Sequence, residues 1–150
     1  MRSFAIKGLV VASVIFGVGK SFAHAEEIAV SFVHAKGRVD IPVSALDQVR
    51  AYPTFKFRNS ETGVVREFPD PHVEICVTKE FKERVCDLTK KVVGEATAVV
   101  VDCETVTKPI VREPLCTRPC FTISANDLAE ANALAQRIRR GTNHACAPSF

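Results

Sequence analysis

The chain has 150 residues, of which 47% are hydrophobic and 25% charged, with a formal net charge of +3 at pH 7. This length and composition suit one domain with a sizeable core, and no internal repeat, low-complexity tract or Pro/Gly/Ser-rich linker divides the chain. The sequence shows no catalytic or cofactor-binding motif, so compartment and architecture are the first questions that it can answer.

The first 25 residues have the three parts of a secretory signal peptide. Arg2 and Lys7 give a positive start, residues 8–19 are apolar, and an A-x-A cleavage site ends at Ala25. A helix of twelve apolar residues rises only ~18 Å, well short of the ~30 Å hydrocarbon core of a bilayer. We therefore expect cleavage after Ala25 and a single mature domain of residues 26–150, without a membrane span, in the periplasm or secreted.

Removal of this leader changes the charge balance. The full chain has 20 basic and 17 acidic residues, and the leader contains three basic residues and no acidic one, so the mature chain is neutral overall. Nucleic-acid binders usually keep a cationic excess that displaces counterions from phosphates; we therefore predict no nucleic-acid partner. A mild basic surplus toward the C-terminus is typical of a solvated helix end, with an anionic-surface patch as the alternative. Its basic members are Lys108, Arg112, Arg118, Arg137, Arg139 and Arg140.

Residues 28–43 have the alternation of a β-hairpin. Apolar side chains occupy every second position on both sides of a turn at 35–37. Ser44 then occupies a position that suits a helix N-cap, which predicts a brief helical turn over 44–50.

A second hairpin is predicted around the polar turn at 59–63. Phe55 and Phe57 share one face of the strand before this turn, and a returning strand follows it. The Pro-Asp-Pro segment at 69–71 comes next. Because proline donates no hydrogen bond to a ladder, we expect strand pairing to end there.

A third hairpin is predicted from a strand over 73–77, a turn at 80–82 and a return through Val85. This register sets Cys76 opposite Cys86. Directly opposed residues of antiparallel strands have Cα atoms ~4.5 to 5.5 Å apart, which is near the range that a disulfide tolerates.

The segment Thr97–Val101 is almost continuously apolar, as is typical of a strand covered on both faces, so we place it at the centre of the sheet. Residues 104–119 carry three prolines, which predicts a stapled loop or an edge hairpin rather than a central strand. A short strand over 121–123 follows.

One helix is predicted, over residues 125–140. Ser124 and Asp127 form a capping-box-like start, the body contains no Gly or Pro, and Gly141 provides the C-terminal stop. An apolar stripe predicts packing on the sheet, with a partner-docking face as the alternative. The predicted fold class is α+β, a mostly antiparallel sheet with one C-terminal helix.

All six cysteines follow the leader, and in an oxidising compartment they predict three disulfides that stabilise the domain. A bridge from Cys120 to Cys146 would tie the exit of the helix back to its entry. The pairing that we expect is one of the 15 that six cysteines allow. It joins Cys76 to Cys86, Cys103 to Cys116, and Cys120 to Cys146.

A redox or metal-binding role is an alternative use of the same residues. Cys116 and Cys120 have one spacer residue too many for a redox Cys-x-x-Cys pair, and they precede an extended segment. Together with His144 they form a weak candidate site for Cu(I) or Zn(II). No second Cys/His pair has structural zinc spacing, and we therefore predict neither a metal nor a cofactor.

The sequence offers little support for an enzyme. It lacks a G-x-S-x-G elbow, an H-E-x-x-H helix and a phosphate-binding glycine loop. His72 and Asp70 form a candidate dyad, but their proline-rich surroundings are more typical of a rigid turn and no nucleophile accompanies them. A non-catalytic protein is favoured, and an unusual triad assembled from distant residues stays open.

A protein inhibitor is a further alternative. A disulfide-braced Leu115–Phe121 loop would present Arg118 to a partner at a reduced ordering cost. Pro119 removes the following amide hydrogen, which makes this peptide bond a poor mimic of a cleavable one. The sequence as a whole favours an exported binding or accessory module of the bacterial periplasm or exterior, whose partner is a protein or an envelope component.

Overall fold

The computed structural model describes residues 26–118, 120–142 and 146. The expected signal peptide, Pro119 and His144 lie outside the described residues. Within the described part of the chain, neither helix has the length and apolar character needed to cross a membrane.

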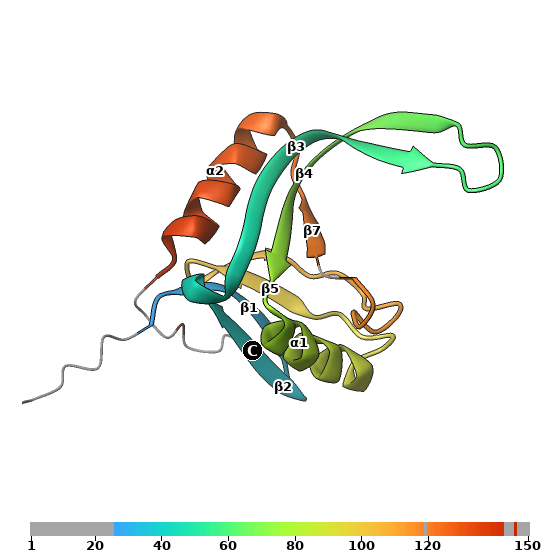
Figure 1. Cartoon of the computed structure of the whole chain (residues 1–150). Coiled ribbons are helices and arrows are strands. Elements are labelled where there is room, and N and C mark those ends of the chain that lie inside the picture. The colour runs from blue at the N-terminus through green and yellow to red at the C-terminus, as the bar shows by residue number, and fades with distance from the viewer. Residues whose placement is uncertain (1–25, 119, 143–145, 147–150) are drawn as a thin grey trace, which may run out of the picture.

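Two antiparallel sheets and two helices make up the fold (Figure 1). The elements are β1 (Ile28–His34), β2 (Gly37–Pro42), the 3-10 turn η1 (Val43–Ala45), β3 (Leu46–Arg58), β4 (Val65–Val77), α1 (Lys79–Lys91), β5 (Ala98–Val101), β6 (Glu104–Thr107), β7 (Cys120–Ser124) and α2 (Leu128–Arg140). One sheet has the strand order β2-β1-β5-β6 and the other β3-β4-β7. The predicted α+β class, with its antiparallel sheets and C-terminal helix, is confirmed, although a second helix was not expected.

The first sheet follows the predicted pattern closely. β1 and β2 form the expected hairpin, with His34 opposite Gly37, and β5 lies in the interior of the sheet between β1 and β6. The helical turn predicted over 44–50 is shorter and earlier, because η1 ends at Ala45 and β3 begins directly after it.

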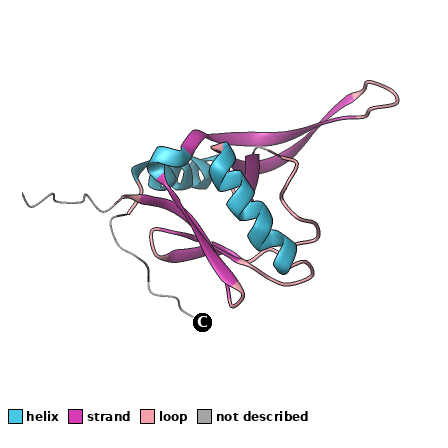
Figure 2. Ribbon diagram, turned by 60° about the horizontal axis from the view of Figure 1, so that its bottom comes forward, coloured by secondary structure: helices cyan, strands magenta, loops and turns pink. Residues whose placement is uncertain are grey.

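β3 and β4 form a long hairpin around the predicted turn, and its outer part projects from the body of the molecule (Figures 1 and 2). We call this part, residues 53–71, the arm. The expected end of pairing at 69–71 is wrong. Tyr52 pairs with His72 and Thr54 with Pro69, so β4 carries one extra residue between these pairs. A β-bulge of this kind accommodates prolines that a regular ladder would exclude.

The third predicted hairpin is also wrong, because residues 79–91 form helix α1. Phe81, Val85, Leu88 and Val92 recur at i, i+4, i+7 and i+11, which is the spacing of one helical face. Val85 and Leu88 are buried, and α1 packs against β2. The apolar residues before position 78 have the period of a strand, and the period changes to that of a helix after it.

Helix α2 begins three residues later than predicted. Asp127, not Ser124, is the N-cap and accepts a hydrogen bond from the Glu130 amide at 2.7 Å. Gly141 ends the helix as expected, with φ of 68°. A side chain at Gly141 would place its Cβ 2.5 Å from Val43 Cγ2, so glycine is required by space as well as by backbone conformation.

The hydrophobic core lies between the two sheets and beneath α2. The predicted stripe of α2 faces inward except at Leu128, which is 40% exposed, and the helix packs on β3, β4 and β1. Phe32 of β1 and Phe121 of β7 meet edge to face across the two sheets, with ring centroids 4.9 Å apart. Ile41, Ile75 and Ile138 are completely buried among these elements.

Candidate functional site

All six cysteines form disulfides, but none of the three expected pairs is correct. Cys76 lies directly opposite Cys120 in the β4–β7 ladder, with Cα atoms 4.0 Å apart. Directly opposed strand positions are joined by a disulfide here, but the partner is on β7, because Cys86 lies on α1 and not on a returning strand. The other two bridges join Cys86 to Cys116 and Cys103 to Cys146.

The Cys86–Cys116 bridge fixes the loop that precedes β7 onto α1. Next to it, the buried Thr89 hydroxyl donates to the Val85 carbonyl at 2.8 Å and accepts from the Leu115 amide at 3.0 Å. Nearer its start, the same loop is hydrogen-bonded to the segment before β5: the Val111 amide donates to the Glu95 carbonyl at 3.0 Å. The loop is therefore fixed in position by its contacts with α1 and with the segment before β5.

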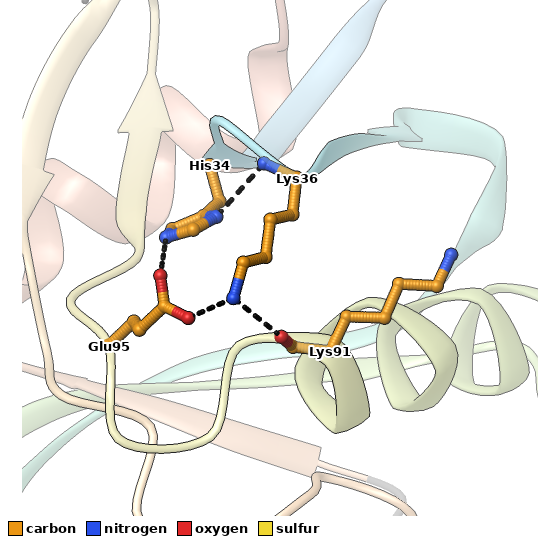
Figure 3. A network of polar contacts seen from close by, with 4 residues as sticks. All are labelled: His34, Lys36, Lys91 and Glu95. Atoms are coloured by element: carbon orange, nitrogen blue, oxygen red, sulfur yellow. Dashed lines mark hydrogen bonds and ion pairs between the residues drawn. The ribbon is translucent and has the colours of Figure 1, made fainter.

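A polar network holds the segment that carries this second contact (Figure 3). The Lys36 amide donates to His34 Nδ1 at 3.0 Å, so the opposite ring nitrogen, Nε2, carries the hydrogen that reaches Glu95 Oε2 at 3.1 Å. The Lys36 ammonium contacts the other Glu95 oxygen and donates to the Lys91 carbonyl at 3.3 Å, at the C-terminal end of α1.

The Lys36 ammonium, by its hydrogen bond and its charge, holds the pKa of the Glu95 carboxyl below the ordinary value of 4.5, with a smaller contribution from His34. Partial desolvation opposes this shift but does not cancel it. Glu95 is therefore ionised at neutral pH. It links the β1–β2 turn to the segment that the loop before β7 contacts.

An apolar groove of about 340 Å³ lies between this loop and β7. Its lining includes Phe32, Val99, Ile110, Leu115, Phe121 and Ile123, with Arg112, Glu113 and Arg118 among its charged members. Ile110 is 61% exposed on this lining.

β7 forms one edge of its sheet beside this groove. Among all the residues that the structure describes, β7 pairs with β4 alone. The Ala125 amide donates to the Pro71 carbonyl at 2.8 Å, toward β4. In a strand the amide and carbonyl of one residue point to the side opposite those of the next residue. The amides and carbonyls of Thr122 and Ser124 therefore point away from β4. In the described part of the chain these amides and carbonyls have no backbone partner, so the groove is bordered by groups that can pair with an added strand.

A second groove, of about 440 Å³, lies where the arm leaves the body. We call it the arm-root groove. Its lining combines aromatic rings with two carboxylates: Tyr52, Phe55 and His72 lie with Glu67, Glu74, Lys56, Thr54 and Thr122. The Tyr52 and His72 rings are stacked, with centroids 5.5 Å apart.

The candidate dyad of Asp70 and His72 does not form through the carboxylate. His72 Nδ1 lies 2.7 Å from the backbone carbonyl oxygen of Asp70. Since a carbonyl only accepts, Nδ1 carries the hydrogen, and in the neutral ring Nε2 is an acceptor. Among the described residues, Nε2 has no hydrogen-bond partner although His72 is only 6% exposed.

The other predicted site residues are separated or occupied. Cys116 and Cys120 belong to different disulfides and offer no thiolate for a metal or for redox exchange. The third member of that set, His144, lies outside the described residues. Arg118 is exposed and lines the apolar groove, so the predicted Leu115–Phe121 loop forms part of its wall.

Part of the C-terminal basic surplus is engaged within the protein. Arg137 donates to the Val101 carbonyl at 3.1 Å and to Glu104 at 2.8 Å, and Arg139 contacts the Val49 carbonyl. Arg137 and Arg139 are therefore held by contacts within the protein, and these contacts give no support to an anionic-surface patch.

A family model described as the P1 head subdomain of SecDF matches residues 45–143. The chain belongs to this family. The matched segment contains β3, β4, both helices and β7, and so includes the arm, the arm-root groove and the lining of the apolar groove except Phe32. No curated protein sequence matches the chain.

Two solved structures are similar to this chain in fold. One is a membrane component SecDF that enhances protein export, with 20% identity and a TM-score of 0.50 over 75% of this chain. The other is SecDF in a super-membrane-facing form, with 22% identity and a TM-score of 0.52 over 69% of this chain. The chain spans 46% of the first structure and 12% of the second.

Proposed function

We propose that this chain is an exported, non-catalytic accessory module of protein export, which binds extended polypeptide outside the cytoplasm. Its membership of the SecDF P1 head family supports a role in export. Three disulfides within the described residues support an oxidising compartment, periplasmic or extracellular. The proposal includes the signal peptide at 1–25 and a single mature domain from residue 26.

The outward edge of β7 is the observation that carries the binding mode. The amides and carbonyls of Thr122 and Ser124 point away from β4, directly beside the apolar groove, and are unpaired within the described residues. An extended segment added to this edge would pair its backbone with β7 and place alternate side chains in the groove. Backbone pairing is independent of sequence, which suits a module that handles many different polypeptides.

The rigidity of the groove supports the same role. The Cys86–Cys116 bridge, the Thr89 hydroxyl and the Glu95 network all hold its wall in place before any ligand arrives. A preformed site loses less conformational entropy on binding, so modest contacts suffice for measurable affinity.

Proline at position 122 tests this binding mode. Thr122→Pro removes an amide hydrogen that points away from β4, so it leaves the β4–β7 ladder intact. Thr122→Ala is the matched control, since it removes the same side chain and keeps the amide. The probe is a fluorescein-labelled peptide of alternating apolar and small residues, titrated into the oxidised protein by fluorescence anisotropy.

We expect Thr122→Pro to weaken binding about two- to tenfold, the value of one backbone hydrogen bond, and Thr122→Ala to bind within about twofold of wild type. Ile110→Ser should also weaken binding, because it removes apolar surface from the groove. Thermal melts of each variant report whether the fold survives. Wild-type binding that Thr122→Pro leaves unchanged, or no wild-type binding, would overturn the proposal.

A further inference from the structure

The geometry points to a second recognition site: we propose that the arm-root groove binds the guanidinium group of an arginine side chain. That this arginine belongs to a bound polypeptide rests on the proposed binding of polypeptide at β7. The site itself stands on Glu74, His72 and Tyr52, which strand addition to β7 does not use.

The carboxylate of Glu74 is available to a cationic ligand. Its Oε1 atom accepts a hydrogen bond from Gln48 Nε2 at 3.2 Å. In the described part of the chain, Glu74 takes part in no ion pair, unlike Glu67, which lies 3.9 Å from the Lys56 ammonium. Glu74 is half-buried in the groove, where a neutralising charge would be worth more than in bulk water.

His72 supplies a second acceptor. Its Nδ1 hydrogen is committed to the Asp70 carbonyl, so the neutral ring presents Nε2 as an acceptor. Nε2 has no hydrogen-bond partner among the described residues, so a ligand donor would find it available. Guanidinium carries five such donors in a fixed plane, enough to reach His72 and a carboxylate at once.

Aromatic rings complete the site. Tyr52 is stacked on His72, and Phe55 meets the same imidazole edge to face at 6.2 Å. Planar guanidinium stacks on aromatic faces, whereas the compact ammonium of lysine gains less from them. The groove volume of about 440 Å³ accommodates a whole basic side chain.

Charge also favours a cation. The lining contains two carboxylates, Glu67 and Glu74, and one ammonium, that of Lys56. Because Lys56 is paired with Glu67, the charge that remains unpaired is negative. An anionic ligand would meet Glu74 without compensation.

The two grooves meet at Thr122, which lines both. Thr122 is the neighbour of Glu74 in the ladder. In a strand added to β7, a side chain opposite Thr122 would lie on the face of the sheet that carries Glu74, and long side chains reach diagonal neighbours. An arginine at that position would enter the arm-root groove while its backbone pairs with β7.

The test uses N-acetyl-arginine amide as the probe and its citrulline counterpart, which has the same shape without the charge. Each is titrated into the isotope-labelled, oxidised protein and followed by NMR at His72, Tyr52 and Glu74. We expect saturable shifts at these residues with the arginine compound alone. Equal shifts with citrulline, or no shifts at these residues, would overturn the inference.

Variants separate the site from general charge effects and from β7. Glu74→Gln should weaken arginine binding about tenfold, as expected for a hydrogen-bonded charge pair, while Glu61→Gln removes the same charge from the hairpin turn and should change nothing. Ile110→Ser, which changes only the apolar groove beside β7, should leave arginine binding intact. If the arginine compound binds and the fluorescein-labelled peptide does not, the proposed function fails and this site stands. If Glu74→Gln binds the arginine compound as tightly as wild type does, the site is contradicted.

Discussion

The body of the molecule and the arm are built from the same two strands but differ in what covers them. In the body, α2 packs on β3 and β4, and Val49, Val73 and Ile75 are buried. In the arm, Phe55, Phe57 and Phe68 alternate in the same way but are 43–52% exposed. Strand alternation therefore sets which side chains share a face, whereas burial depends on elements that lie far away in the sequence.

This difference predicts that stability resides in the body. Ile75→Ala, in the part of β4 beneath α2, should lower the free energy of unfolding by about 2–5 kcal/mol, because it leaves a cavity in a fully buried position. Chemical denaturation followed by circular dichroism measures the change. A loss below about 1 kcal/mol would show that the core relaxes around this site and would weaken the comparison.

Removal of the Cys76–Cys120 bridge should have the next largest effect. This bridge closes a sequence separation of 44 and joins β7 to β4. The paired change to serine should cost about 2–4 kcal/mol and loosen the groove edge. Denaturation of the double variant beside the oxidised wild type measures this cost, and an unchanged midpoint would mean that the β4–β7 ladder holds without the bridge.

A smaller, pH-dependent effect is expected at Glu95. Its pKa is lowered in the folded protein, so its contribution to stability is present above the ordinary value of 4.5 and is lost as pH falls through the lower folded value. Glu95→Gln should therefore be slightly less stable than wild type at pH 7, with a difference that shrinks in acid. Melting temperatures across pH 3 to 7 measure it; a difference that grows in acid would contradict the network.

The smallest effect is expected in the arm. Phe57 is 52% exposed and lies opposite Arg66 near the turn. Phe57→Ser should change stability by no more than about 0.5 kcal/mol, as for most surface positions. A loss comparable to that of Ile75→Ala would mean that the arm is packed against something in solution, and the two regions would no longer differ as described.

Local sequence patterns predicted much of the fold. The hairpins of β1–β2 and β3–β4, the interior position of β5 and the apolar stripe of α2 follow from the period of apolar residues. Helix α1 was missed although Phe81, Val85 and Leu88 carry its period, because the preceding strand suggested a hairpin return. Recognition of that helical spacing would have removed the incorrect Cys76–Cys86 pair.

The candidate sites needed the tertiary structure. Cys76 meets Cys120, and Thr122 forms a free edge, only because β7 joins β4 at the side of the sheet. Sheet order is a non-local property that alternation within a strand does not encode. Similarly, His72 was identified as a candidate beside Asp70, but its open Nε2 atom and its stacking on Tyr52 depend on the bulge in β4 and on pairing across the hairpin.

Amide hydrogen exchange with and without an unfolded apolar peptide tests the central claim most directly. Strand addition to β7 predicts that the outward amides of Thr122 and Ser124 become protected when the peptide binds, while the amides of Phe121 and Ile123, already bonded toward β4, change little. Peptide binding that leaves Thr122 and Ser124 unprotected would contradict the account.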